Sequence, residues 1–223
     1  MRYVACFTSG TKGGTGKSML SLLLTLSLAY VKGRVLLVDM GGAARKMLAT
    51  LEPPYLSDVM INRVSWREAV LEVEVESTVF HLIPRGHRIE QLRLEWLDEA
   101  KSYFENILID MPAYQSPIFD KVIDSSDVCI LVAEPGAVSE VVSSYRGESY
   151  LIVVLNKYKP HFIEDKIYLE NTFGEENVYV LPFDPALSCL NPRYFTQALS
   201  YVSKDFMKSF KRLLSRMLNP YER

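Results

Sequence analysis

The sequence predicts an α/β protein built on one doubly wound, mostly parallel sheet with helices on its faces. Short apolar runs recur along the chain, and each is followed by polar residues, proline or glycine. Helical patterns separate several of these runs, as they do where crossover helices join parallel strands. A glycine-rich loop also stands between the first apolar run and a long apolar helix, which is the order strand, loop, helix of a phosphate-binding loop.

The expected elements follow from these runs in chain order. Proline ends one helix at Pro53 and one strand at Pro84, because it lacks the N–H that the next hydrogen bond needs. Strands are expected at residues 2–8, 34–39, 78–84, 106–110, 127–133, 150–155 and 178–181. Helices are expected at residues 19–31, 45–51, 56–60, 66–71 and 88–103, with a basic amphipathic helix in 196–223.

Length and composition limit the function classes. The 223 residues, 48% of them hydrophobic, are expected to form a single domain over residues 1–223. The formal charge of −2 excludes a globally basic nucleic-acid binder but not a local basic patch. Three widely spaced cysteines favour neither a disulfide framework nor a paired-cysteine metal site. The N-terminus lacks a signal-peptide pattern and the first helix is too short to span a bilayer, so we expect a cytoplasmic protein.

The stretch from Thr8 to Ser18, T-S-G-T-K-G-G-T-G-K-S, carries the clearest chemistry. Its glycines allow backbone N–H groups to turn toward an anion. Lys17 is placed for the β- and γ-phosphates, and Ser18 offers a hydroxyl to Mg²⁺ at a helix start. The strict pattern G-x-x-x-x-G-K-[ST] fails at Thr11, and Lys12 precedes the glycine pair instead. The predicted nucleotide-binding residues here are Thr11, Lys12, Gly13, Gly14, Thr15, Gly16, Lys17, Ser18 and Met19.

Two apolar runs end in aspartate, at Asp39 and at Asp110. Asp110 occupies the place of a Walker B carboxylate, which holds the hydration shell of Mg²⁺ in P-loop proteins. Asp39 ends an earlier strand in the same way. The predicted metal ligands are therefore Ser18, Asp39 and Asp110.

Asn156 and Lys157 follow another strand and are interpreted as a base-recognition step. An amide can pair with a purine edge, and a lysine stem can cover its face. The guanine-specific pattern N-K-x-D would need Asp at the position of Lys159, so guanine is disfavoured. One further segment is equally compatible with a wall of the base pocket and with an ordinary turn, namely Pro182, Phe183 and Asp184.

Taken in order, these motifs resemble the ParA/MinD family of deviant Walker ATPases, and the likeness covers essentially the whole chain. The matching segments are K-G-G-T-G-K-S at 12–18, V-L-L-V-D at 35–39, F-H-L-I-P-R-G at 80–86, I-L-I-D-M-P at 107–112, S-D-V-C-I-L-V-A-E-P at 126–135 and V-L-P-F-D-P-A at 180–186. The resemblance implies ATP and Mg²⁺ as cofactors, and a sandwich homodimer in which Lys12 reaches the partner's nucleotide. It implies catalytic roles for Lys12, Lys17, Asp39 and Asp110.

The chain departs from this family at switch I, where D-x-D is usual and the sequence reads Asp39-Met40-Gly41. The missing second acid orients the attacking water in the family. We therefore expect ATP binding with hydrolysis that is slow or depends on an activating partner protein. A residue other than glycine at position 11 also occurs in ParA-like members, so Thr11 favours the ParA branch over MinD. The segment between Pro135 and Tyr150 is short for the family.

The C-terminal residues 196–223 carry six basic and two acidic side chains, a net charge of +4, so the rest of the chain carries −6. Apolar residues recur here at helical spacing, which is typical of a last helix that packs on the sheet with its basic face in solvent. That face could also contact DNA phosphates or an anionic membrane surface.

Three functions therefore stay open. The first is a partition-type ATPase whose ATP-bound dimer binds DNA without sequence specificity. The second is a MinD-like positioning ATPase that associates with membranes. The third is a metabolic or metal-carrier relative on the same fold, against which the absence of paired cysteines argues.

Overall fold

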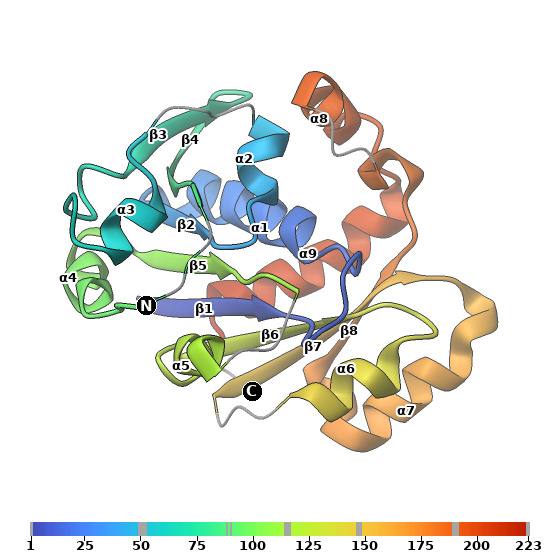
Figure 1. Cartoon of the computed structure of the whole chain (residues 1–223). Helices are drawn as coiled ribbons and strands as arrows, with labels where there is room; N and C mark the ends of the chain where they lie inside the picture. Colours follow the sequence, from blue (N-terminus) through green and yellow to red (C-terminus); the bar gives the residue numbers. More distant parts are fainter. Residues whose placement is uncertain are drawn as a thin grey trace.

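The computed structural model describes residues 2–48, 53–87, 89, 91–113, 117–145, 149–188 and 192–221. Within them one sheet contains eight strands in the order β3-β4-β2-β5-β1-β6-β7-β8 (Figure 1). The strands are β1 (Tyr3–Thr8), β2 (Val35–Asp39), β3 (Leu71–Val75), β4 (Thr78–Ile83), β5 (Asn106–Asp110), β6 (Val128–Ala133), β7 (Tyr150–Tyr158) and β8 (Val178–Pro182). All neighbouring strands are parallel except β3 and β4, which confirms the predicted fold class.

Helices cover both faces of the sheet, and the two sides of each strand supply separate cores. Alternate residues of β1 show this, because Ala5 packs in the core under α1 and α9 while Cys6 packs on the opposite face. In Figure 1, α1 and α9 lie behind the sheet, and α4 to α7 lie on its other side. The helices are α1 (Lys17–Lys32), α2 (Ala43–Leu48), α3 (Leu56–Met60), α4 (Trp96–Tyr103), α5 (Pro117–Asp124), α6 (Val138–Ser144), α7 (Ile163–Phe173), α8 (Pro192–Leu199) and α9 (Lys204–Leu218).

The central strands β1, β2, β5 and β6 are buried along their whole length. Their continuous apolar sequences are typical of parallel strands covered on both faces. In each of these runs the predicted and observed strands agree to within one residue. In the described part of the chain, short 3₁₀ helices lie at Pro160–Phe162, Glu175–Asn177 and Pro185–Ser188.

Two predicted helices are wrong in part or in whole. Residues 66–69 form a turn, and Leu71 begins strand β3. The predicted helix at 88–103 begins only at Trp96, and residues 91–95 are not helical, while residues 88 and 90 lie outside the described part. The predicted helix at 45–51 is α2, whose described part ends at Leu48.

The edge of the sheet at β3 is a charged edge. Glu72 and Glu74 alternate with apolar residues along this strand and are exposed. Charged side chains on an edge strand oppose pairing with another chain.

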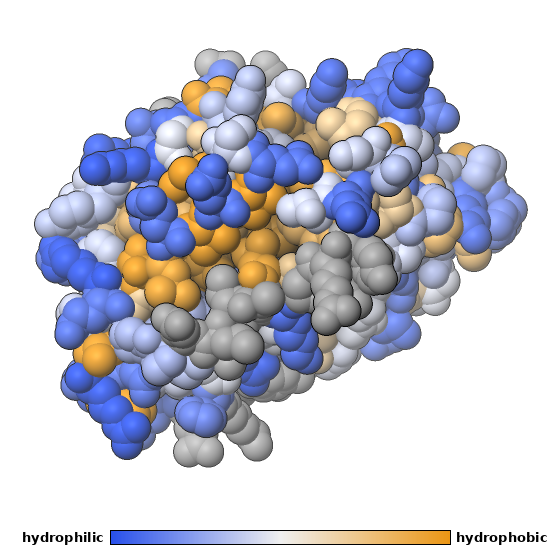
Figure 2. All heavy atoms as spheres, turned by 90° about the horizontal axis from the view of Figure 1, so that it is seen from above, coloured by the Kyte–Doolittle hydropathy of each residue, from blue (hydrophilic) through white to orange (hydrophobic). Residues whose placement is uncertain are grey.

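Seen from above, apolar surface gathers in the region of β3, β4 and α2, and hydrophilic side chains surround it (Figure 2). Val79 of β4, 40% exposed, is an apolar side chain that this edge does not bury.

The C-terminal helix α9 packs its apolar stripe on the sheet, as expected for a last helix. The buried members of that stripe are Phe206, Phe210, Leu213 and Met217. The Tyr3 hydroxyl donates to the Met217 carbonyl at 2.5 Å, and Lys32 Nζ donates to the Leu218 carbonyl at 3.0 Å. These two bonds hold the end of α9 against β1 and α1.

Within the described residues, no helix has the length and apolar character needed to cross a membrane. The same part of the chain contains no group of three His, Cys, Asp or Glu side chains suited to holding a metal ion. Cys6 and Cys129 are free and buried, and Cys189 lies outside the described residues.

Candidate functional site

The loop between β1 and α1 has the backbone of an anion cradle. Gly10, Gly14 and Gly16 adopt positive φ values of 56°, 81° and 91°, which residues with a Cβ rarely adopt. A Cβ on Gly16 would lie 2.3 Å from Asn156 Nδ2, so the close approach also requires glycine there. The first turn of α1 contains no acidic residue, and its N–H groups and dipole are therefore available to an anion.

Lys17 and Asp110 form the buried electrostatic centre of the site. Burial lowers the pKa of Lys17, and the carboxylate of Asp110 opposes that shift. Burial and the neighbouring Asp39 carboxylate raise the pKa of Asp110 to about 7, although Ser18 and Lys17 act in the opposite direction. Asp39 and Asp110 are register partners on β2 and β5, which brings the two acids to one edge of the sheet. No donor reaches either Asp110 oxygen with hydrogen-bond geometry in the described structure.

Gly41 is the position at which the resemblance predicts a second switch I acid, and the space beside it is filled. A Cβ at this position would lie 2.9 Å from Oδ2 of Asp110 and 3.6 Å from the Met111 carbonyl oxygen. The Gly41 amide donates to the Asp110 carbonyl at 2.8 Å. The Gly42 amide donates to the Asp39 carboxylate at 2.6 Å. The switch I backbone is therefore packed directly against the two aspartates.

Lys12 is held within its own chain in this structure. Its ammonium lies 3.7 Å from the carboxylate of Glu140 on α6, and the Thr11 hydroxyl donates to the same carboxylate at 3.2 Å. Both Lys12 and Glu140 side chains are partly exposed, at 37% and 51%. The loop also closes on itself, because the Ser9 hydroxyl donates to the Lys12 carbonyl at 2.6 Å.

Asn156 and Lys157 reach the phosphate loop from the end of β7. The Asn156 amide donates to the Thr15 carbonyl at 2.8 Å, and Lys157 Nζ donates to the Gly14 carbonyl. Lys157 also pairs with Glu134 at 3.0 Å. Both side chains therefore brace the phosphate loop here, in addition to lining the cavity where a base was predicted.

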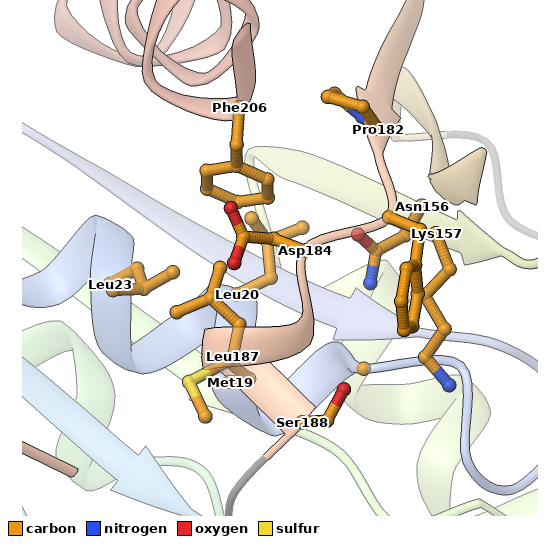
Figure 3. A pocket seen from close by; sticks show the side chains of 12 residues that line it. Met19, Leu20, Leu23, Asn156, Lys157, Pro182, Asp184, Leu187, Ser188 and Phe206 are labelled. Carbon is orange, nitrogen blue, oxygen red and sulfur yellow. The ribbon is translucent and has the colours of Figure 1, made fainter. Parts of the chain in front are cut away.

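Two adjacent cavities lie beside the loop. The larger has a volume of about 550 Å³ and is lined by loop residues, by Gly41 and Arg85, and by residues that follow β5 and β8. This volume falls within the range of small-molecule sites. The smaller, about 50 Å³, lies between α1, the ends of β7 and β8, and α9 (Figure 3). Gly16, Met19, Lys157, Phe183, Leu187 and Ser188 line both cavities.

The smaller cavity has an apolar side and a polar side. In Figure 3, Leu20, Leu23 and Phe206 gather on one side, and Asn156 and Lys157 lie on the other. The sheet end beside it supplies the predicted wall residues Pro182 and Phe183. Phe183 is 41% exposed, and the centroid of its ring lies 4.8 Å from Lys159 Nζ.

Asp184 lines the same cavity, but its carboxylate is engaged with the backbone. One oxygen accepts from the Ala186 amide at 2.9 Å and the other from the Ser203 amide at 2.8 Å. Ser203 is the N-cap of α9 and accepts from the Phe206 amide. Asp184 therefore joins the turn after β8 to the start of α9, a role that its sequence position did not indicate.

Sequence analysis did not assign a role to Arg85, Glu140 or Leu187. Arg85 stands in the predicted strand ending P-R-G and lines the larger cavity. A signal for it was present, because it follows a parallel strand at the edge of the sheet where ligands bind. Glu140 and Leu187 carry no such signal, since only the folded chain brings them to the loop.

The profile of the CobQ/CobB/MinD/ParA nucleotide-binding domain matches residues 6–191. The chain belongs to this family. It is thus a member of the ParA/MinD group of P-loop ATPases, as the motifs indicated. No curated protein sequence matches the chain.

Solved structures of the family share the fold over nearly the whole chain. The cell division ATPase MinD of Pyrococcus furiosus is 24% identical, with a TM-score of 0.74, and the match covers 99% of this chain and 100% of that one. Apo McdA of Cyanothece is 18% identical, with a TM-score of 0.74 over 98% and 100%. A ParA family ATPase of Chlorobium tepidum is 17% identical, with a TM-score of 0.73 over 96% and 99%. At such identities the likeness shows the fold alone.

Proposed function

We propose that the protein is an ATP-dependent switch ATPase of the ParA type. In this proposal it binds ATP with Mg²⁺, forms a homodimer in the ATP state, and hydrolyses ATP slowly unless a partner protein activates it. The observation that supports it most is a cavity of about 550 Å³ lined by the glycine loop and the buried Lys17. The buried acids Asp39 and Asp110 are register partners at the ends of the neighbouring strands β2 and β5.

The Asp39 and Asp110 pair fits a divalent cation. Both carboxylates are fully buried, and neither Asp110 oxygen has a partner with good hydrogen-bond geometry among the described residues, although the Ser18 hydroxyl is close enough to lower the Asp110 pKa. Burial and the neighbouring Asp39 carboxylate raise the pKa of Asp110, so a cation between the two acids would favour their charged forms. Together with the Ser18 hydroxyl these oxygens are the ligand type that Mg²⁺ prefers. When bound with ATP, the cation would supply positive charge against the phosphates.

Slow hydrolysis follows from the groups around Gly41. Orienting the attacking water is a large part of phosphoryl-transfer catalysis. The second acid is absent, and Asp39 accepts a hydrogen bond from Gly42. The chain's own residues can hold the nucleotide, since Lys17 and the loop amides face the cavity, but the described residues offer no further carboxylate at switch I.

Light scattering after size-exclusion chromatography tests the switch. We expect a monomer without nucleotide and a dimer with Mg²⁺ and a non-hydrolysable ATP analogue. Lys12→Ala should bind the analogue yet remain monomeric, and Lys17→Ala should lose binding. Lys46→Ala, an exposed lysine of α2, should behave as the wild type. A wild-type chain that stays monomeric when saturated with the analogue would contradict the proposal.

For the surface that the dimer binds, we propose DNA, with a role in plasmid or chromosome partition in the cytoplasm. The apolar stripe of α9 is buried, whereas Lys204, Lys208 and Lys211 are exposed. A helix arranged this way presents charge to phosphates without offering an apolar face to a bilayer. Gel-shift titration with the analogue, at low and high salt, is the direct measurement.

The alternative is a MinD-like ATPase that associates with membranes, which the MinD structures among the similar folds keep open. Flotation with vesicles that contain anionic lipid separates the two functions. Flotation that depends on ATP, without DNA binding in low salt, would favour the MinD-like function over the partition function.

A further inference from the structure

Arg85 is a cation at the larger cavity that sequence analysis assigned to no role. It comes two residues after the end of β4 and is partly buried. It lines the same cavity as Lys17 and Ser18, although 67 positions or more separate it from them in the chain and it comes from a strand on the far side of β2.

The contacts of Arg85 hold its guanidinium beside switch I. Nη1 donates to the Gly41 carbonyl at 3.2 Å. The stem packs closely on the loop, because a Cβ at Gly42 would lie 3.2 Å from Arg85 Cδ. Among the described residues no acidic side chain forms an ion pair with Arg85. Position 41 is glycine, so switch I also lacks a second acid that could pair with Arg85 beside the cavity.

The order of the strands gives the direction of a bound nucleotide. The phosphate loop follows β1 in the middle of the sheet, and the smaller cavity, where a base was predicted, lies at β7 and β8 on one side. A nucleotide with its base at the smaller cavity would extend its phosphates past the loop toward β5, β2 and β4 on the other side. Arg85 lies after β4, on the side of the phosphate loop away from β7 and β8, where the terminal phosphate of such a nucleotide would lie.

We propose that Arg85 binds the γ-phosphate and makes the site distinguish ATP from ADP. This inference rests on the proposed nucleotide-binding function. The planar guanidinium presents several N–H donors, so it can keep its bond to the Gly41 carbonyl and bind a phosphate oxygen as well. The presence of the γ-phosphate is thereby coupled to the switch I segment through one side chain.

The test compares affinities for a non-hydrolysable ATP analogue and for ADP, each with Mg²⁺, by fluorescence titration. Arg85→Gln keeps an amide donor for the Gly41 carbonyl but removes the charge. We expect it to weaken binding of the analogue about ten- to a hundredfold, as loss of a hydrogen bond to a charged group would. Its affinity for ADP, which lacks the γ-phosphate, should stay near that of the wild type.

Two further variants control for charge and for folding. Arg85→Lys retains the positive charge without the planar fork, so it should lose less affinity for the analogue than Arg85→Gln. Arg63→Gln removes an arginine that is 73% exposed and lies outside the cavity lining, and it should bind both nucleotides normally. Thermal melting of each variant shows whether the folded state persists.

The outcomes distinguish a failure of this inference from a failure of the proposed nucleotide-binding function. A wild-type chain that binds neither nucleotide overturns the proposed function. A wild-type chain that binds both, with Arg85→Gln unchanged or weakened equally for both, overturns the role of Arg85 alone. Selective loss of analogue binding supports it. If Arg85→Gln does not fold, the comparison of Arg85→Lys with the wild type decides, because full retention of the preference for the analogue by a lysine would exclude a specific guanidinium contact.

Discussion

At the scale of single residues, the protonation of Asp110 makes the stability of the folded, metal-free chain depend on pH. Burial and Asp39 raise the pKa of Asp110 from 3.8 to about 7. The folded chain therefore holds this proton between about pH 4 and pH 7 while the unfolded chain releases it. Its contribution to stability is present below pH 4 and is lost as the pH rises through 7.

This linkage makes a prediction for Asp110→Asn, which cannot ionise. Without Mg²⁺ or nucleotide, the melting temperature of the variant minus that of the wild type should increase from pH 5 to pH 8. The increase should be about 2–4 °C for each kcal/mol of unfolding free energy that the wild type loses over this range. Asp120→Asn, an exposed acid of α5, is the matched control. Melting curves in EDTA across this range provide the measurement, and a difference that does not change with pH would contradict the burial of an unpaired carboxyl.

A second prediction concerns restoring the acid at position 41. Because a Cβ there lies 2.9 Å from Oδ2 of Asp110, both Gly41→Ala and Gly41→Asp must displace that carboxylate. We expect a loss of stability of about 1–3 kcal/mol from the overpacking alone, with a larger loss for Gly41→Asp, which adds a third negative charge. ATP turnover by Gly41→Asp should not exceed that of the wild type.

Unfolding in urea and a phosphate-release assay on both variants check this. The alanine variant separates the steric effect from the charge effect. A tenfold or greater gain in turnover for Gly41→Asp would show that the site accommodates a working acid at position 41 despite the packing against Asp110.

The residues of the loop could be predicted because their chemistry is local. Gly16, Lys17 and Ser18 act through backbone geometry and adjacency, which the sequence pattern records directly. Arg85 and Glu140 could not be assigned in this way, because their partners depend on which strand ends and helices the fold brings together. Asp184 shows the same limit, since its bond to the Ser203 amide exists only once α9 docks.

At the scale of elements, the contact between the phosphate loop and α6 is the one that bears on dimerisation. Glu140 holds Lys12 within its own chain, whereas the proposed dimer requires Lys12 to reach the partner's nucleotide. Ion pairs between partly exposed side chains contribute about 0–1 kcal/mol, so this restraint is weak and reversible.

We therefore predict that Glu140→Gln tightens the dimer only modestly. Release of Lys12 should lower the dimer dissociation constant, measured by sedimentation with Mg²⁺ and the ATP analogue, by at most about fivefold. The amide can still accept from Thr11, so the loop should keep its conformation. Glu164→Gln on α7 is an exposed control. Weaker dimerisation in Glu140→Gln would show that Glu140 supports the assembled state.

The elements that sequence analysis missed have physical causes. Strand β3 reads L-E-V-E-V, and its alternation of apolar and acidic residues is a strand signal. The helix predicted at residues 66–71 ran into the first residue of this strand, so the strand was not predicted. The helix predicted from residue 88 was too long, because Leu92 and Leu94 pack on the core from an irregular segment and imitate helical spacing. Short crossover helices such as α6 were missed because they contain too few residues to show the 3.6-residue hydrophobic period of a helix.

At the scale of the whole molecule, the fold class followed from the sequence but the strand order did not. Apolar runs ending in polar residues predict a parallel sheet whose carboxyl ends gather at one edge. Which strands become neighbours depends on crossover packing that no local pattern contains. The order matters for function, because it sets β4 opposite β7 and β8 across the phosphate loop. That the chain is one domain remains a prediction.

The distribution of charge over the molecule leads to the last prediction. Outside residues 196–223 the chain carries a net negative charge, while the exposed face of α9 carries Lys204, Lys208 and Lys211. If the ATP-bound dimer binds DNA through this face, replacing the three lysines with glutamine removes three phosphate contacts per chain. The slope of log affinity against log salt concentration should then become shallower by about 0.9 for each lost contact.

Fluorescence anisotropy with a duplex of mixed sequence, at several salt concentrations and with the ATP analogue, measures that slope. The control replaces Lys101 and Lys121, on α4 and α5 of the opposite face, and should leave the slope unchanged. Binding by the α9 variant with an unaltered slope would place the DNA contact elsewhere. Because the apolar stripe of α9 stays buried in every variant, dimerisation with the analogue should be unaffected, which separates loss of the DNA surface from loss of the switch.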